Sequence, residues 1–146
     1  MKYLIYKNHK AFSLLLIISL TIGCSLKNTV SIDQLKGYWE IDFVKQQGEV
    51  FKTNSVTPLY DHYILNENKG VLNKVAPSMM GIFQTSTNAT SFQVEKRKEG
   101  FYLHFKTSWD EWSKKIVFLD DQKLILEHEK KTFYYKRPLL INLNNE

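Results

Sequence analysis

The chain has 146 residues, a formal net charge of +5 and an isoelectric point near 9.2, a length that accommodates one domain. Aromatic residues make up 14% of it, against only six glycines and three prolines, which excludes a disordered or collagen-like chain. Its single cysteine, Cys24, excludes an internal disulfide framework and a zinc site built on paired thiolates.

The first segment has the pattern of a targeting signal. Lys2, Lys7 and Lys10 precede an uncharged apolar run at residues 11–22. A membrane-spanning helix needs about 20 apolar residues, so this shorter run is typical of a secretory signal peptide. We therefore assign residues 1–23 to a signal peptide.

Cys24 follows the small residue Gly23 at the end of this run, in the order Leu-Thr-Ile-Gly-Cys-Ser. The arrangement resembles the lipobox of bacterial lipoproteins, in which the cysteine sulfur receives a diacylglycerol and the new amino terminus is acylated. The resemblance implies lipidation of Cys24, with acyl chains such as palmitate holding the protein permanently in a membrane. The alternative is an unmodified cysteine in an ordinary signal peptide or membrane helix.

Removal of the signal peptide changes the charge. The remaining chain carries 17 basic and 15 acidic residues, a net charge of +2. Basic runs are flanked by acids, as where Glu95 and Glu99 surround residues 96–98. This interleaving predicts solvated hairpin tips and does not favour a nucleic-acid partner.

The domain begins after a short polar tether at residues 24–30. Ser31 and Gln34 have the spacing of a capping box, which predicts one helical turn before Gly37. We place the folded domain at residues 31–138 and a tail at residues 139–146.

Beyond Gly37 the hydrophobic period is two, which indicates strands separated by turn residues. The connections are short, so the pattern predicts an all-β fold, an antiparallel meander that closes into a small β-barrel. In the strand around residues 101–107, Phe101, Leu103 and Phe105 alternate with polar residues and are expected in the core. The predicted strands are residues 38–45, 49–53, 59–65, 71–75, 81–85, 91–96, 101–107, 114–119, 123–129 and 131–137.

The segment Leu-Lys-Gly-Tyr-Trp at residues 35–39 resembles the entry to the first strand of lipocalins, where a helical turn precedes a Gly-x-Trp motif. Residues 115–119, 124–126 and 134–137 resemble the last strands of the short lipocalin-like domains found in envelope lipoproteins of Bacteroidota. The resemblance follows the order of elements over residues 31–138. The domain is shorter than a typical lipocalin, which implies a small or partly open barrel.

The lipocalin resemblance implies a structural role for three residues at one barrel end. In that family the Trp of the motif closes the barrel, and an Arg at the end of the last strand packs across it. Carried over, these residues are Trp39 and Arg137, with Gly37 allowing their close approach.

Catalytic and metal-binding patterns are absent from the sequence. The histidines His62, His104 and His128 do not have metal-ligand spacing, and the adjacent acids Asp110 and Glu111 are expected in a solvated turn. No nucleophile motif, zinc-protease motif or phosphate-binding loop occurs. We therefore expect no enzymatic activity, no cofactor and no metal.

Four apolar side chains are candidates for contacts with a ligand or partner. Trp109 and Trp112 flank a predicted hairpin tip, and Met79 and Met80 lie in another loop. On a barrel such tips would line a mouth or contact a protein or lipid. The alternative is that they cap the ends of the core.

Two functional hypotheses follow. The first is a lipid-anchored envelope lipoprotein whose barrel binds a small apolar ligand or lipid. The second is a non-catalytic accessory subunit that docks by exposed loops onto an outer-membrane protein complex. By resemblance to bacterial lipoprotein sorting, Ser25 favours the outer membrane, and the lack of an acidic export signal at residues 25–28 favours a periplasm-facing domain.

Overall fold

The computed structural model describes residues 30–52, 58–77, 83–85 and 89–139. Within them, no helix is long and apolar enough to cross a membrane. The described elements are η2 (Ile32–Leu35), a 3-10 helix, and the strands β1 (Gly37–Gln46), β2 (Glu49–Phe51), β3 (Tyr60–Asn66), β4 (Lys69–Pro77), β5 (Phe83–Thr85), β6 (Thr90–Arg97), β7 (Gly100–Lys106), β8 (Glu111–Leu119), β9 (Lys123–His128) and β10 (Lys131–Lys136).

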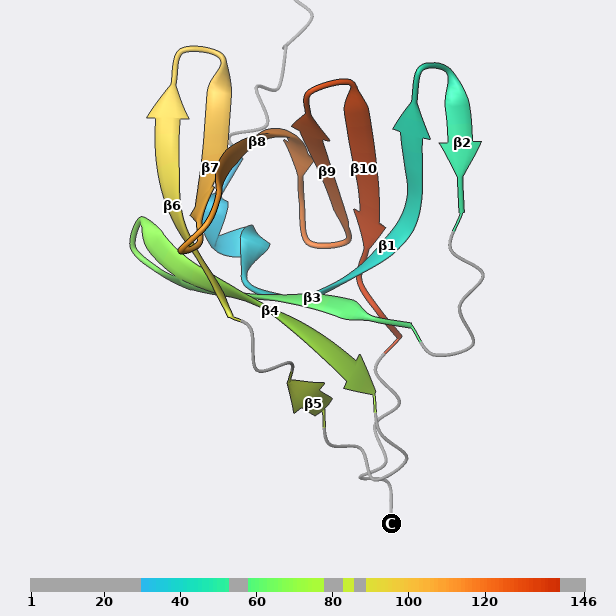
Figure 1. Ribbon diagram of the computed structural model, residues 1–146, viewed down its shortest axis with the longest axis horizontal. Helices are drawn as coiled ribbons and strands as arrows, with labels where there is room; N and C mark the ends of the chain where they lie inside the picture. The colour runs from blue at the N-terminus through green and yellow to red at the C-terminus, as the bar shows by residue number, and fades with distance from the viewer. Residues whose placement is uncertain (1–29, 53–57, 78–82, 86–88, 140–146) are drawn as a thin grey trace, which may run out of the picture.

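The strands form one antiparallel sheet in the order β10-β9-β8-β7-β6-β4-β3-β1-β2, with β5 paired to β4. β1 also pairs with β10, so the sheet closes on itself around η2 (Figure 1). Closure removes the exposed sheet edge at this seam. The predicted all-β fold, an antiparallel meander that closes into a barrel, is confirmed.

β1 is the strand on which closure depends. One of its edges pairs with β10, while the other pairs first with β3 and then with β2. The ladder shifts register between Ile41 and Phe43, and a second shift lies between Ile116 and Phe118 on β8. Such bulges bend a strand and increase its twist, as a small barrel requires.

The core lies inside the ring of strands. The predicted core residues Leu103 and Phe105 are fully buried, and Phe101 packs against the core while partly buried. Phe92 also belongs to this cluster. The remaining buried members are Leu35, Trp39, Tyr63, Leu65, Leu72, Val94, Ile116, Leu119, Leu124, Leu126 and Tyr135.

The predicted helical turn is present as η2, but the predicted capping box is not formed. The Ser31 side chain makes no capping hydrogen bond. Instead, the Gln34 amide donates to the Ser31 carbonyl oxygen at 3.1 Å. A single turn with this i-to-i+3 bond satisfies its own amide without a side-chain cap.

The strand limits differ from the prediction by up to three residues, and β4 extends two residues beyond its predicted range at each end. β8 begins at Glu111, three residues before the predicted start, and Trp112 pairs with Phe105 inside the ladder. The adjacent acids Asp110 and Glu111, which the sequence places in a solvated turn, hide this early start. β9 ends at His128, because Glu129 takes a left-handed turn conformation with φ of 53°.

Several predictions lie outside the described residues. These are the signal peptide at residues 1–23, Cys24 and the tether up to residue 29, the loop residues Met79 and Met80, and the tail from residue 140 onward.

Candidate functional site

One end of the barrel is filled by Trp39 and covered by Arg137. The guanidinium lies 3.6 Å from the centroid of the Trp39 ring, a cation–π contact. The Trp39 indole N–H donates to the carbonyl oxygen of Leu35 at 2.8 Å. Both Trp39 and Leu35 are fully buried, so this end of the interior is sealed.

Arg137 also ties three backbone segments together. Its Nη2 donates to the Gln34 carbonyl oxygen at 2.6 Å, and its Nη1 donates to those of Lys36 and Tyr38 at 3.0 and 3.1 Å. Its Nε donates to the Asp121 carbonyl oxygen in the β8–β9 turn at 3.0 Å. The rigid fork of a guanidinium makes such divergent contacts possible. Burial lowers the pKa of Arg137, and the Asp121 carboxylate opposes that effect.

Gly37 provides the space for this arrangement. Its φ is +100°, and a Cβ at this position would lie 3.2 Å from Nη1 of Arg137. L side chains rarely adopt this conformation, so glycine is favoured here. The structure thus brings Gly37, Trp39 and Arg137 together at one barrel end, as the lipocalin resemblance implied.

A polar cluster lies inside the barrel on β3, β4 and β10. Residues paired across antiparallel strands share a face, and Asp61 pairs with the interior residue Trp39 on one side and with Lys74 on the other. Asp61 is only 3% exposed, and its carboxylate forms an ion pair with Lys74 and accepts a hydrogen bond from the Tyr135 hydroxyl at 3.2 Å. The Lys74 side chain is 50% exposed, so the ion pair joins a buried carboxylate to a cation that reaches solvent.

Tyr63 contributes a buried hydroxyl to the same interior. The residue is 1% exposed, and its hydroxyl has no hydrogen-bond partner within the described part of the chain. Burial raises the pKa of Tyr63 well above its ordinary value, and Tyr135 and Asp61 add to the rise, so the hydroxyl remains a donor. An unpaired buried donor costs about 1–3 kcal/mol, which makes it a candidate ligand contact.

Lys114 enters the interior from β8. It pairs with the fully buried Leu103, and its Nζ lies 4.7 Å from the Phe133 ring centroid and 5.6 Å from that of Phe105. Among the described residues it forms no hydrogen bond or ion pair. Burial lowers the pKa of Lys114, Asp61 opposes this shift, and Lys74 adds to it. Lys114 is therefore a partly buried cation that contacts aromatic rings, and the Asp61 carboxylate favours its charged form.

An aromatic row adjoins the polar cluster. Tyr63 meets Phe92 edge-on at 5.7 Å, Phe92 lies 5.6 Å from Phe105, and Phe105 stacks on Trp112 at 5.4 Å. Gly70 on β4 admits the Phe92 ring, because a Cβ there would lie 2.3 Å from that ring. The row is part of the hydrophobic core and lies beside the charged groups.

The two tryptophans predicted to flank one tip have different surroundings. Trp109 lies in the β7–β8 turn and is 95% exposed. Trp112 pairs with the interior residue Phe105 and packs against the core. Only Trp112 faces the interior, because β8 begins before it, whereas Trp109 projects from the turn into solvent.

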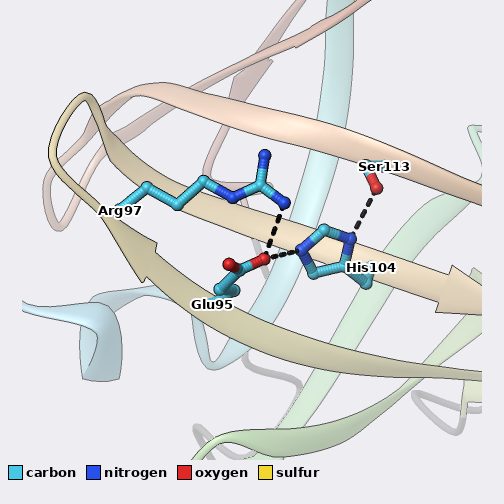
Figure 2. A network of polar contacts seen from close by, with 4 residues as sticks. All are labelled: Glu95, Arg97, His104 and Ser113. Atoms are coloured by element: carbon cyan, nitrogen blue, oxygen red, sulfur yellow. Dashed lines mark hydrogen bonds and ion pairs between the residues drawn. The ribbon is translucent and has the colours of Figure 1, made fainter.

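A second polar network lies on the outer face of β6, β7 and β8 (Figure 2). His104 contacts Ser113 Oγ through Nδ1 and Glu95 Oε2 through Nε2, each at 2.6 Å, and Arg97 donates to the same carboxylate oxygen at 2.8 Å. These bonds to Arg97 and His104 lower the pKa of Glu95. The Glu95 and Arg97 side chains are nearly half exposed, and such surface networks contribute little stability.

Two surface hollows flank this network. One of about 330 Å³ is lined in part by His104, Lys106 and Glu111, and one of about 320 Å³ in part by Ser113 and Lys115. Both carry acids and bases, so neither selects a ligand of one charge.

The histidines engage in separate contacts rather than in a metal site. His62 stacks on Tyr38 with ring centroids 4.1 Å apart, and Nδ1 of His128 contacts the Ser113 carbonyl oxygen at 2.8 Å. Within the described ranges, no group of three or more potential ligands could hold a metal ion.

Comparisons with known proteins found similarity to two solved structures. No family model and no curated protein matches the chain. A lipocalin-like protein from Bacteroides uniformis is 12% identical, with a TM-score of 0.46 over 72% of this chain and 99% of that one. An uncharacterized protein from Bacteroides eggerthii is 12% identical, with a TM-score of 0.45 over 70% and 98% of the two chains.

The sealed end predicts unequal effects for the two arginines. Arg137→Lys should lower the free energy of unfolding by about 2 kcal/mol, because an ammonium cannot reproduce the four bonds and the stacking. Arg97→Lys, at an exposed ion pair, should leave it nearly unchanged. Denaturant unfolding measures both, and equal losses would contradict the role assigned to Arg137.

Removing the hydroxyl of each interior tyrosine should change the free energy of unfolding in different ways. Tyr135→Phe removes a hydrogen bond to a buried carboxylate and should cost about 1.5–3 kcal/mol. Tyr63→Phe removes an unpaired buried hydroxyl and should leave the ligand-free protein as stable or up to about 1 kcal/mol more stable. Unfolding curves of the two variants decide the point; a marked loss in Tyr63→Phe would mean that its hydroxyl is already paired.

Proposed function

We propose that this protein binds a small, mainly apolar ligand or lipid inside its barrel. The supporting observation is the interior itself, where the buried carboxylate of Asp61 and the unpaired hydroxyl of Tyr63 lie beside aromatic rings. Small-molecule sites combine apolar walls with a few polar groups that orient the ligand. A barrel stabilised by packing alone would gain from apolar residues at these positions.

The architecture suits such a role. Arg137, Trp39 and Leu35 seal one end, whereas the polar cluster around Asp61 reaches the surface through the half-exposed Lys74. A ligand would therefore enter on the Lys74 side and lie against the aromatic row.

We further propose that Cys24 is acylated and anchors the domain in the outer membrane, with the barrel in the periplasm. Support comes from the apolar run at residues 11–22, the Gly23–Cys24 junction and the absence of an acidic signal at residues 25–28. A tether of a few polar residues would keep the barrel close to the membrane surface.

A second candidate is the accessory subunit that docks onto an outer-membrane complex. Trp109 favours it, because a tryptophan that is 95% exposed at a hairpin tip is typical of an interface anchor. Removal of Trp109 distinguishes the candidates, since it would weaken docking and leave interior binding intact.

The neutral dye N-phenyl-1-naphthylamine tests interior binding. We expect saturable fluorescence enhancement at one dye per chain, because the dye matches an aromatic-lined interior. Trp112→Leu should weaken binding several-fold, and the control Trp109→Leu should not. Circular dichroism verifies folding of both variants. Absence of saturable binding, or loss only in Trp109→Leu, would overturn the proposal.

The anchor is tested by metabolic labelling with a palmitate analogue in a bacterial host. Labelling and membrane association should both disappear in Cys24→Ala, because acylation needs the sulfur, while Ser25→Ala should retain them. Labelling that persists in Cys24→Ala would rule out the anchor.

A further inference from the structure

The outer face of the barrel carries a row of apolar side chains. The strands β1, β10, β9 and β8 follow one another around the ring (Figure 1), and each contributes an outward-facing apolar residue that pairs with the next. We call this set the outer row; its members are Phe43, Tyr134, Ile125, Phe118 and, beside the last of them, Val117. The solvent face of an antiparallel sheet is commonly polar, so apolar residues on four successive strands indicate a contact surface.

Alternation along the strands shows that the row points away from the core. Leu124 and Leu126, on either side of Ile125, are fully buried, and Tyr135 beside Tyr134 is 2% exposed. Neighbours on a strand face opposite sides of the sheet, so Ile125 and Tyr134 face outward. No member of the outer row belongs to the core cluster or packs against it.

The bulge in β8 adds to the exposed apolar area of the row. The ladder shifts register between Ile116 and Phe118, and in a bulge two residues of one strand oppose a single residue of its partner. Val117 is the extra residue, and it is 51% exposed. The other four members are partly exposed, so the row meets solvent.

Two lysines lie over the rings of the outer row. Nζ of Lys45 lies 5.8 Å from the Phe43 ring centroid and 5.2 Å from that of Tyr134. Nζ of Lys123 lies 5.9 Å from the Phe118 centroid and 6.0 Å from that of Tyr134. Both lysines are exposed, and within the described ranges neither forms an ion pair.

The acids on this face have other lysines beside them. Glu40 and Asp42 lie 3.6 and 3.8 Å from Nζ of Lys136. Glu127 stands opposite Lys115 in the ladder between β9 and β8, a position in which opposite charges attract. The two lysines over the rings are therefore the uncompensated charges of the outer row, and both are positive.

An apolar surface bordered by unpaired ammonium groups complements a partner that is apolar within and negative at its surface. A bilayer with anionic head groups has this chemistry, because lysine stems can lie along apolar surface while their ammonium groups reach the phosphates. We propose that the outer row docks the barrel onto an anionic lipid bilayer, with Lys45 and Lys123 on the phosphates. The choice of a lipid surface rests on the proposed anchor at Cys24, which would hold the barrel beside a membrane.

The chain offers a matched control for charge. Lys69 on β4 and Lys98 in the β6–β7 turn are exposed, and these strands lie across the ring from β1 and β10 (Figure 1). The double variants Lys45→Gln/Lys123→Gln and Lys69→Gln/Lys98→Gln therefore remove equal charge from different sides of the barrel. Salt of about 0.1 M screens charges that are more than about 10 Å from a surface, so the two variants should differ.

A second control concerns the apolar contact. Val117→Ser removes an apolar side chain from the outer row without changing the charge. Ile64→Ser makes a comparable change on β3, outside the row, because Ile64 is 50% exposed and Val117 is 51% exposed. The two variants thus differ mainly in position.

The experiment is co-sedimentation of residues 24–146, made without the signal peptide and therefore unacylated, with lipid vesicles. The wild type should bind vesicles of equal parts phosphatidylcholine and phosphatidylglycerol about tenfold or more tightly than phosphatidylcholine alone. Lys45→Gln/Lys123→Gln should remove most of this preference, and Val117→Ser should weaken binding several-fold. Both control variants should bind like the wild type, and circular dichroism verifies that every variant is folded.

The outcomes decide the proposal without involving the other two. Equal losses in the two lysine pairs would assign binding to net charge, and wild-type binding by Val117→Ser would exclude contact through the apolar row; either result overturns the inference. Absence of binding to the mixed vesicles also overturns it and leaves a protein as the partner of the row. Acylation of Cys24 and dye binding in the interior are measured separately, so their failure is distinguishable from failure here.

Discussion

The contact of Arg137 with Trp39 and four backbone carbonyls is the interaction on which the architecture depends. The guanidinium holds η2, the start of β1 and the β8–β9 turn in one place, while the indole beneath it fills the barrel end. A sheet of this size could remain open, but pairing of β1 with β10 brings the strand ends to Arg137 and removes an edge. The pairing of β1 with β10 therefore both closes the sheet and places Arg137 over the barrel end.

The interior away from the sealed end differs from it in polarity. Polar groups accumulate there: a buried carboxylate with two partners, a hydroxyl without one, and a cation against aromatic rings. Each is costly to bury, and none contributes to the sealed end. Packing alone does not account for these polar groups, and the proposed binding of a ligand rests on them.

Much of the fold could be predicted from the sequence, because period-two alternation and turn residues determine short antiparallel strands. Leu103 and Phe105 follow that alternation, and their strand is found where it was expected. Gly37, Trp39 and Arg137 were found through a motif and its order in the chain. The alternation is a local pattern. Glycine and arginine can be placed because few other residues can adopt a positive φ or make several divergent hydrogen bonds.

The interior site could not be predicted, since its residues break the same alternation. A lysine normally indicates an outward position, so the alternation did not mark Lys114 as inward-facing, and the acids Asp110 and Glu111 placed Trp112 at a predicted tip. Asp61 and Tyr63 lie among apolar residues of β3 with no spacing that marks them as a pair. Register shifts at Ile41 and Ile116 also change which residues face inward, and alternation alone cannot locate them.

The seam between β1 and β10 has a consequence for how the chain reaches this structure. Most strand pairs join neighbours in sequence, but the bonds from Arg137 to η2 and β1 span 99 to 103 residues. Contacts of such separation carry the largest loop-closure entropy and slow folding. The hairpins can form early and separately, whereas the seam waits for β10 to be synthesised. Until then both edges of the sheet are exposed, so the open sheet is the stage at which this protein is most exposed to aggregation.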